Sequence, residues 1–275
     1  MKTSPPARRP SPSLGSAPAA WRHATVGGLL GLCVALVVWA PAHWLAWGVA
    51  QASQGQVQWL NARGTVWQGS AQLVLSGGAG SRNAQALPGR LHWAIAPTWT
   101  GVRLNWRADC CMTDAATVHL QAGWNTWAVQ ADDHTSRWPA ALLSGLGAPW
   151  NTLQAQGQLQ LRTQALRLQW TQGRLQMQGL AELEVQQLSS RLSPVKPMGS
   201  YRLALSGTPE GTPTPSLALS TLQGPLLVSG QGQWVGQRLR FTGEARAEEG
   251  QEAAFDNLLN IVGRRQGTRS LLSLG

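Results

Sequence analysis

The chain has 275 residues, of which 12% are charged and 43% are hydrophobic, and its formal net charge is +10. This length suffices for one large domain or two small ones, and uncharged polar residues must supply much of the surface. The basic excess raises the question of a nucleic-acid partner. Past residue 50, however, the arginines are mostly scattered singly, and only Arg264 and Arg265 are adjacent. A nucleic-acid groove needs clustered charge beside aromatic platforms, so the distribution argues against this partner.

The first 20 residues are a low-complexity run of Pro, Ser and Ala that also contains Lys2, Arg8 and Arg9. Such a composition cannot bury enough apolar surface to fold. We therefore predict a disordered tail over residues 1–23.

Residues 24–48 contain no Asp, Glu, Lys or Arg, and tryptophans gather at their C-terminal end at positions 39, 44 and 47. A bilayer core requires about 20 apolar residues in a helix, and an aromatic belt is typical of the membrane interface. We predict one transmembrane helix over 24–48. The basic residues of the N-terminal region all precede it, which predicts a cytoplasmic N-terminus and an exported remainder.

A cleaved signal peptide is the alternative for this segment, with Ala40-Pro41-Ala42 as a small-residue cleavage site. The apolar run continues past that site and the N-terminal region is long, which favours an uncleaved anchor. In both interpretations the residues after 50 lie outside the cytoplasm.

Apolar and polar residues alternate through most of the remaining chain, for example in 71–77, 101–108, 156–163 and 238–247. Strict alternation is typical of strands with one buried and one solvated face, and short turns between them favour antiparallel pairing. The fold class predicted for 55–275 is therefore mainly β. We expect an antiparallel meander, built as one curved sheet or as two packed sheets.

One or two short helices are expected within this β domain. Residues 136–147 are one candidate, with Ser136 as N-cap. The clearer one follows Glu248, where Phe255, Leu258, Leu259 and Val262 form one apolar face. Gly263 suits its C-terminal cap, and Arg264 and Arg265 complement the helix dipole there. The segment 269–275 then reads as a final strand.

Two Trp-Gly motifs stand near the ends of the β domain. In the first, Gly64 and Gly69 flank a short strand that directs Trp67 to the core, and Gly69 permits a tight bend. In the second, Gly232, Trp234 and Gly236 repeat this arrangement. The two motifs are explained equally well as the starts of ordinary β-hairpins and as the result of an internal duplication.

The cysteines do not form a metal-binding or redox motif. Cys33 lies in the apolar run, and Cys110 and Cys111 are adjacent, as free thiols or as a vicinal disulfide. No CxxC pair or zinc-ligand spacing is present.

The remaining titratable groups do not form a catalytic motif either. Asp132, Asp133 and His134 are the one local cluster, and a solvated turn explains them. Ser193 and Lys196 match S-x-x-K, but the prolines at 194 and 197 prevent the helix that this motif requires. We therefore expect no catalytic, cofactor-binding or metal site, and no enzymatic activity.

Several segments, taken in order, resemble the type II secretion system protein N family. They are GTVWQGSA, LHWAIAPTWTGVRLNW, LSPVKPMGSYRLALSG, GQGQWVGQRLRFTGEARA and LLNIVGRRQGTRSLLSLG. The resemblance covers nearly the whole chain and is weakest over 108–155. It implies an accessory component of the bacterial inner membrane, with a periplasmic domain, in the machine that exports folded proteins through an outer-membrane secretin. It implies other inner-membrane or secretin-associated secretion proteins as partners, and neither cofactor nor catalytic residues.

A lipid-binding or lipid-transfer protein tethered to the inner membrane is the alternative function. A long open sheet with an apolar concave face would suit lipid transport as well as protein contact. The two differ in whether helices or a second sheet cover that face, because a large uncovered apolar groove needs a ligand or a partner.

Overall fold

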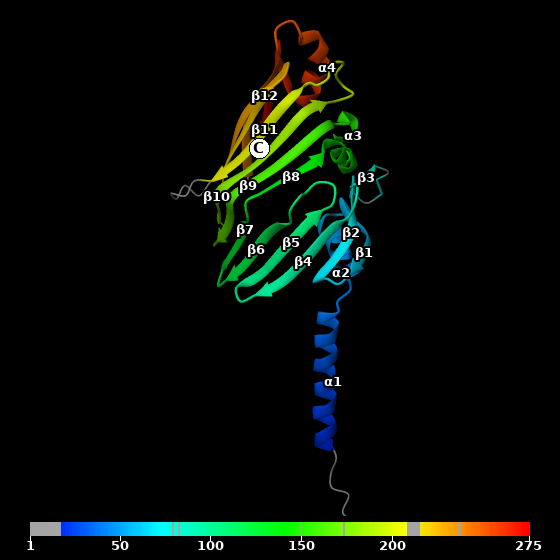
Figure 1. Cartoon of the computed structure of the whole chain (residues 1–275). Helices are drawn as coiled ribbons and strands as arrows, with labels where there is room; N and C mark the ends of the chain where they lie inside the picture. The colour runs from blue at the N-terminus through cyan, green and yellow to red at the C-terminus, as the bar shows by residue number, and fades with distance from the viewer. Residues whose placement is uncertain are drawn as a thin grey trace, which may run out of the picture. The chain divides into compact units, whose positions relative to one another are not determined.

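The computed structural model of the chain describes residues 18–78, 80–81, 83–148, 150–172, 174–207, 215–235 and 238–275. The chain divides into two units, Met1–Ala40 and Pro41–Gly275. The first unit contains helix α1 (Pro18–Val38), and the second, which we call the β unit, contains all the other elements (Figure 1).

The predicted helix over 24–48 is two helices, which corrects the prediction. Helix α1 begins at Pro18, inside the predicted tail, and ends at Val38, while α2 spans Ala42–Ala52. Pro41 separates them with an extended backbone, φ −72° and ψ 146°. Proline has no N–H to donate and disfavours helix at the residue before it, so a single helix cannot run smoothly through this point. Residues 1–17 of the predicted tail lie outside the described residues.

Crossing a bilayer places requirements of length and apolar character on a helix. Among the described residues, no helix is both long enough and apolar enough to meet them.

The described strands join one antiparallel sheet of sixteen strands. In chain order they are β1 (Val57–Gly64), β2 (Gln68–Ser76), β3 (Ala84–Ala86), β4 (Leu91–Thr98), β5 (Gly101–Ala108), β6 (Ala116–Gly123), β7 (Thr126–Ala131), β8 (His134–Pro139), β9 (Gln156–Thr171), β10 (Arg174–Ser189), β11 (Gly199–Gly207), β12 (Ser216–Gln223), β13 (Leu226–Val235), β14 (Arg238–Ala247), β15 (Arg264–Gln266) and β16 (Arg269–Leu274). Neighbours in the sheet are mostly neighbours in the chain, which confirms the predicted meander.

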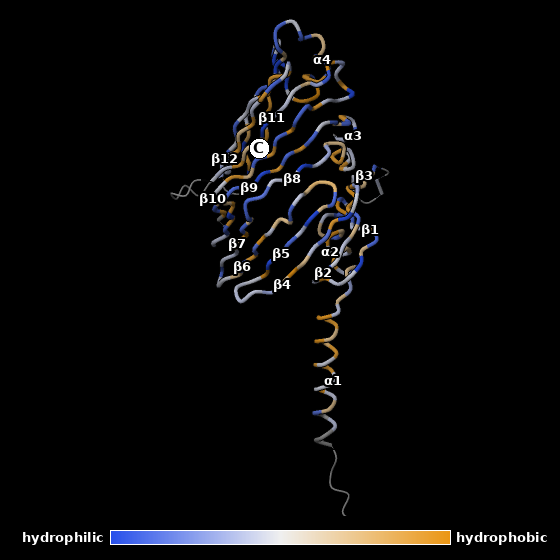
Figure 2. The backbone as a smooth tube through the Cα atoms, in the orientation of Figure 1, coloured by the Kyte–Doolittle hydropathy of each residue, from blue (hydrophilic) through white to orange (hydrophobic). Residues whose placement is uncertain are grey.

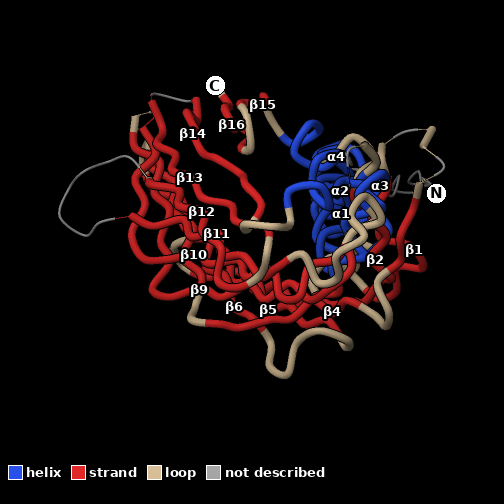
Figure 3. Tube along the Cα trace, turned by 90° about the horizontal axis from the view of Figure 1, so that it is seen from above, coloured by secondary structure: helices blue, strands red, loops and turns tan. Residues whose placement is uncertain are grey.

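The longest pairing is the hairpin of β9 and β10, each of 16 residues. On its other side β9 pairs with two strands in succession, β7 along residues 166–171 and β8 along 158–163. Viewed from above, the sheet curves into an open trough with the helices of the β unit on its inner side (Figure 3). The structure is thus the single curved sheet of the two arrangements expected.

Alternation along the strands gives the sheet one apolar and one polar face. Trp93 pairs with Trp106, and Trp106 pairs with Ala116. Directly opposite residues share a face, so these three lie on the inner, concave side. The residues between them, such as His92 and Arg107, lie on the convex side, and Figure 2 shows the resulting alternation of apolar and polar positions.

The buried core is divided into clusters where helices pack on the concave face. Ala42 of α2 packs with Ala71 and Trp93, and Phe255 of α4 (Glu252–Val262) packs with Tyr201 and other residues of the C-terminal strands. Between them lie two clusters beneath the 3₁₀ helix η1 (Ala140–Leu146), which α3 (Trp150–Leu153) follows. Each helix therefore covers only its own part of the sheet.

The predicted short helices are partly confirmed. Helix α4 lies where the apolar face predicted it, and β16 is the expected final strand. The segment 136–147 begins as strand β8 and becomes helical only at Ala140. Ser136 is not a helix cap, because it is buried and its Oγ accepts a hydrogen bond from Trp138 Nε1 at 2.8 Å.

We predict that Phe255→Ala lowers the free energy of unfolding by about 3–5 kcal/mol, because it removes a fully buried ring from beneath α4. The matched control is Ile261→Ala on the same helix, where the side chain is 60% exposed, and its effect should stay within about 1 kcal/mol. Urea unfolding followed by tryptophan fluorescence measures both variants. Equal losses in the two variants would contradict the packing of α4 on the sheet.

Candidate functional site

The first Trp-Gly motif forms the turn between β1 and β2. Gly64 pairs with Gly69, and Thr65 N donates to the carbonyl oxygen of Gln68 at 2.8 Å. Trp67 lies in this turn and not on a strand. The prediction of a short strand between the two glycines was therefore wrong, since the pair closes a hairpin instead.

Gly69 is required by the approach of Trp93. A Cβ atom on Gly69 would lie 2.5 Å from both the Trp93 ring and the carbonyl oxygen of Arg63. The indole Nε1 of Trp93 donates to the Val66 carbonyl at 3.0 Å, and the ring packs on Trp59 with centroids 4.8 Å apart. The motif thus makes room for Trp93, a core residue of the neighbouring strand β4, and this role is structural.

The second motif has a different local structure. Gly232 and Trp234 both lie within β13, where they pair with Phe241 and Leu239 of β14. Gly236 lies outside the described residues. One motif forms a turn and the other is part of a strand, so the structure gives no support to an internal duplication.

The segment after α4 also differs from its prediction. Gly263 follows the helix in extended backbone, φ −165°, and not as a left-handed cap. Arg264 and Arg265 begin strand β15, where Arg265 donates to Asp256 Oδ1 of α4 at 2.7 Å. This arginine therefore holds the helix through an ion pair with a side chain, and it does not interact with the end of the helix dipole.

A polar cleft of about 830 Å³ contains the cysteine pair and the acidic loop singled out in the sequence. Cys110 and Cys111 form a vicinal disulfide on one side, and Asp133 and His134 line the other. Asp133 Oδ1 accepts a hydrogen bond from the backbone N–H of Ala165 at 2.6 Å, where it supports a bulge in β9. The two cysteines are thus oxidised and Asp133 holds the backbone, while the buried Nε2 of His134 has no hydrogen-bond partner among the described residues.

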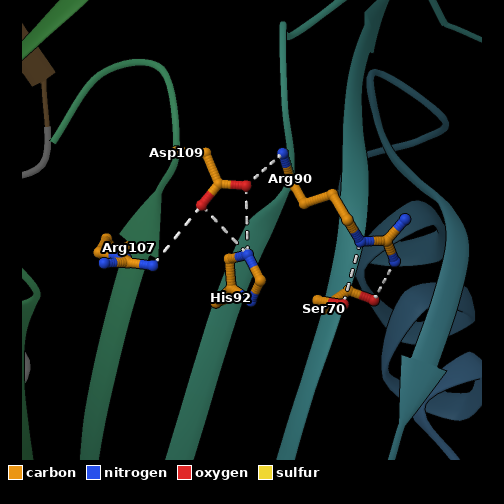
Figure 4. Close-up of polar contacts among 5 residues, drawn as sticks. All are labelled: Ser70, Arg90, His92, Arg107 and Asp109. Atoms are coloured by element: carbon orange, nitrogen blue, oxygen red, sulfur yellow. Dashed lines mark hydrogen bonds and ion pairs between the residues drawn. The ribbon is translucent and has the colours of Figure 1, made fainter.

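Asp109 is the centre of a polar network beside this cleft (Figure 4). Its Oδ2 accepts from the backbone N–H of Arg90 at 3.1 Å, and its Oδ1 lies 3.2 Å from His92 Nε2 and 3.7 Å from Arg107 Nη2. The Arg90 N–H and the His92 side chain are the main causes that hold the pKa of Asp109 below its ordinary value.

The Arg90 guanidinium extends this network across three strands. Its Nη2 donates to the Ser70 carbonyl at 2.9 Å and to the Asn61 carbonyl at 2.8 Å, and its Nε donates to Ser70 Oγ. The network joins β1, β2, β4 and the end of β5 on the convex side of the sheet. Its groups satisfy one another, so we interpret it as a structural staple.

Other charged groups of the described chain follow the same pattern. Arg202 on β11 bridges Glu182 and Glu184 on β10 at 3.3 and 2.7 Å, and its hydrogen bond lowers the pKa of Glu184. Within the described residues, no group of three or more His, Cys, Asp or Glu side chains is arranged to hold a metal ion. These ion pairs order the convex face, and none of them is joined to a nucleophile in a pocket.

The concave face is the surface that the fold leaves incomplete. Its helices lie over one end of the strands, and apolar side chains remain accessible toward the other end. Leu120 pairs with Val129, Trp127 pairs with Trp170, and all face the same side as the core. Leu120 is 42% exposed, Trp127 65% and Trp170 38%. This uncovered part of the concave face is the candidate functional surface.

Sequence reasoning raised a concave apolar face but did not locate its uncovered part. The available signal was that alternation continues to the very tips of the hairpins, while the helical segments are few and short. The pairing register is needed to show that these apolar residues form one surface.

A family model described as "Type II secretion system (T2SS), protein N" matches residues 55–271. The chain belongs to this family. The match starts just before β1 and ends inside β16, so it covers nearly all of the sheet. Proteins of the protein N family are accessory components of type II protein secretion. That this chain belongs to the family confirms the resemblance predicted from the sequence. Comparisons with curated proteins and with solved structures gave no match.

We predict that Asp109→Asn lowers the free energy of unfolding at pH 7 by about 0.5–1 kcal/mol, because it removes the carboxylate charge of a largely exposed network. The folded-state pKa is depressed, so the contribution is complete above the ordinary pKa of 3.8 and disappears as the pH falls through the folded value. The two proteins should therefore converge in stability at the acidic end of a series from pH 7 to pH 3. A difference between the two proteins that stays constant across the series would contradict the assignment.

Proposed function

We propose that this protein N is a non-enzymatic accessory component of the type II secretion machinery that acts by contact. In this proposal it is held at the bacterial inner membrane with its N-terminus in the cytoplasm. The β unit lies in the periplasm and contacts other inner-membrane or secretin-associated components.

The observation that carries the proposal is the family match across the sheet, together with how the polar groups of that sheet are used. The Asp109, Asp133 and Arg202 groups are engaged in bonds that hold strands together. Because these charged groups hold strands together, the features left for function are the surfaces and edges of the sheet. This supports binding to other proteins over catalysis.

The edge formed by β1 is the best candidate for a protein contact. It is first in the strand order, so among the described residues no strand pairs with its outer side. It is eight residues long, whereas β15 at the other end of the order has three. A partner segment in extended conformation can add a strand to such an edge. The register shift between Leu60 and Arg63 limits how far an unrelated strand could pair there.

The support for membrane attachment is compositional. Residues 24–48 carry no charged side chain, and the basic residues of the N-terminal region precede them. The disulfide between Cys110 and Cys111 agrees with an oxidising compartment such as the periplasm.

A second candidate function is lipid binding on the concave face. The specific observation is the row of exposed apolar side chains that runs past Leu120, Trp127 and Trp170, over which no described helix of the β unit lies. Apolar surface of this extent needs a ligand or partner, and an acyl chain would fit a face that carries no charged group at these positions.

Site-specific photocrosslinking in the native membrane tests both functions. A photoreactive residue is placed at Leu60 on the β1 edge, at Leu120 on the uncovered concave face, and at Gln233 on the convex face as a control. We expect the Leu60 probe to capture other secretion components, with little capture from Gln233. Equal capture from Leu60 and Gln233 would contradict contact through the edge. Lipid adducts confined to the Leu120 probe would support the second candidate, and only lipid adducts at every position would overturn the first.

Membrane attachment and topology form a separate prediction. The chain should remain in the membrane fraction after alkaline extraction, and protease added to spheroplasts should degrade the β unit while a tag at the N-terminus stays protected. Replacing Leu29 and Leu36 in α1 with arginine should release the chain from the membrane, because each charge is costly in the bilayer. Recovery of the wild-type chain in the soluble fraction would contradict the attachment.

A further inference from the structure

Three consecutive hairpins present tryptophans at one end of the sheet. Trp99 lies in the turn between β4 and β5, Trp124 in the turn between β6 and β7, and Trp127 pairs with Trp170 near the turn between β9 and β10. We call these four residues the tryptophan rim. Trp99 and Trp124 are completely exposed, at 106% and 100%. Within the part of the chain that the structure describes, these two large rings therefore have no packing partner.

The three tips lie side by side in the sheet. The backbone N–H of Ala122 donates to the Thr100 carbonyl at 3.0 Å, which joins the first tip to the second. Thr126 pairs with Thr171, which joins the second tip to the third. Figure 1 shows the corresponding ends of β4, β5, β6 and β7 together, away from α2, α3 and α4 of the β unit. The rim is thus one continuous margin built from residues far apart in the sequence.

The charge around the rim has one sign. The parts of the three hairpins nearest their tips, 97–105, 119–129 and 166–178, contain no Asp or Glu but contain arginines at positions 103, 167 and 174. Arg107 lies at the far end of β5, 3.7 Å from Asp109, and does not belong to the rim. Arg103 and Arg167 lie on the convex side, because their neighbours Leu104 and Leu168 lie on the concave one. A basic, acid-free margin attracts an anionic surface.

We propose that the tryptophan rim seats the β unit on the surface of an anionic phospholipid bilayer. Tryptophan prefers the interface, where its ring meets the acyl boundary and its N–H stays hydrated. The projecting rings of Trp99 and Trp124 insert into the interfacial region of the bilayer, while the neighbouring arginines contact the phosphates of the lipid headgroups. The uncovered concave face opens at the same margin, so its apolar residues Val102 and Leu120 continue inward from the membrane contact. This contact is separate from the membrane attachment proposed for residues 24–48, and it goes beyond the proposed secretion role.

The test uses the full chain reconstituted into vesicles, so that the membrane attachment proposed for residues 24–48 is kept and the contribution of the rim is measured beside it. In a Cys33→Ser background, an environment-sensitive fluorophore is attached to Thr100→Cys in the first tip. The control label is Gln223→Cys, an exposed residue of β12 at the opposite end of the strands. Vesicles contain phosphatidylcholine alone or with one part in about three of phosphatidylglycerol, and nitroxide on the acyl chains serves as quencher.

The proposal predicts stronger quenching at position 100 than at 223 in anionic vesicles. Trp99→Ser with Trp124→Ser should abolish the difference, while Trp150→Ser, which alters a tryptophan on α3, should leave it. Arg103→Glu should weaken binding of the rim roughly fivefold for the charge removed, and more for the reversal. Equal quenching at 100 and 223, or quenching unaffected by loss of both rim tryptophans, would overturn the proposal and would point to a protein partner for these rings. Quenching that persists in phosphatidylcholine alone would overturn the role of charge.

Discussion

The structure depends on one constraint, which is that an antiparallel sheet with one apolar face must cover that face. A second sheet would do so completely, as in a sandwich, but this chain supplies α2, η1 and α4 instead. Each helix packs over a few strands, and buried residues gather only beneath them. The rest of the concave face keeps the same alternating sequence without a cover. The exposed surface and the stable core are therefore two parts of one pattern.

The sheet was the most predictable part of the fold, for a physical reason. A period of two places every second residue on one face, and the polar residues at alternate positions mark the solvated face. The class, the antiparallel order and the last strand followed from that period, whereas helix α4 followed from apolar residues spaced three and four positions apart. Whether one sheet curves or two sheets pack depends on long-range pairing, which local alternation does not encode.

The incorrect predictions involve residues whose local signal competes with a tertiary contact. Gly64 and Gly69 suggested the ends of a strand, but Gly69 is small because the Trp93 ring, 24 positions later, approaches it closely. The continuous apolar character of 24–48 hid the effect of Pro41, which divides the helices. Gly263 and the two arginines after it were assigned to a helix end, while the pairing of β15 with β16 draws them into extended backbone. The incomplete cover of the concave face could be recognised only once the helices were placed.

The division of the core also has a mechanical consequence. The clusters beneath α2 and α4 share no residues, and they are joined through the two clusters beneath η1 only by partly buried side chains, which are Trp59, Trp138, Val185 and Leu188. The width of the trough is set by the twist and bulges of the intervening ribbons, especially the hairpin of β9 and β10. A β-hairpin without a packed core on its face bends easily, whereas a close-packed core resists compression. We expect the trough to widen and narrow about that hairpin. Its curvature can then adapt to a bound molecule while the packed regions beneath α2 and α4 stay folded.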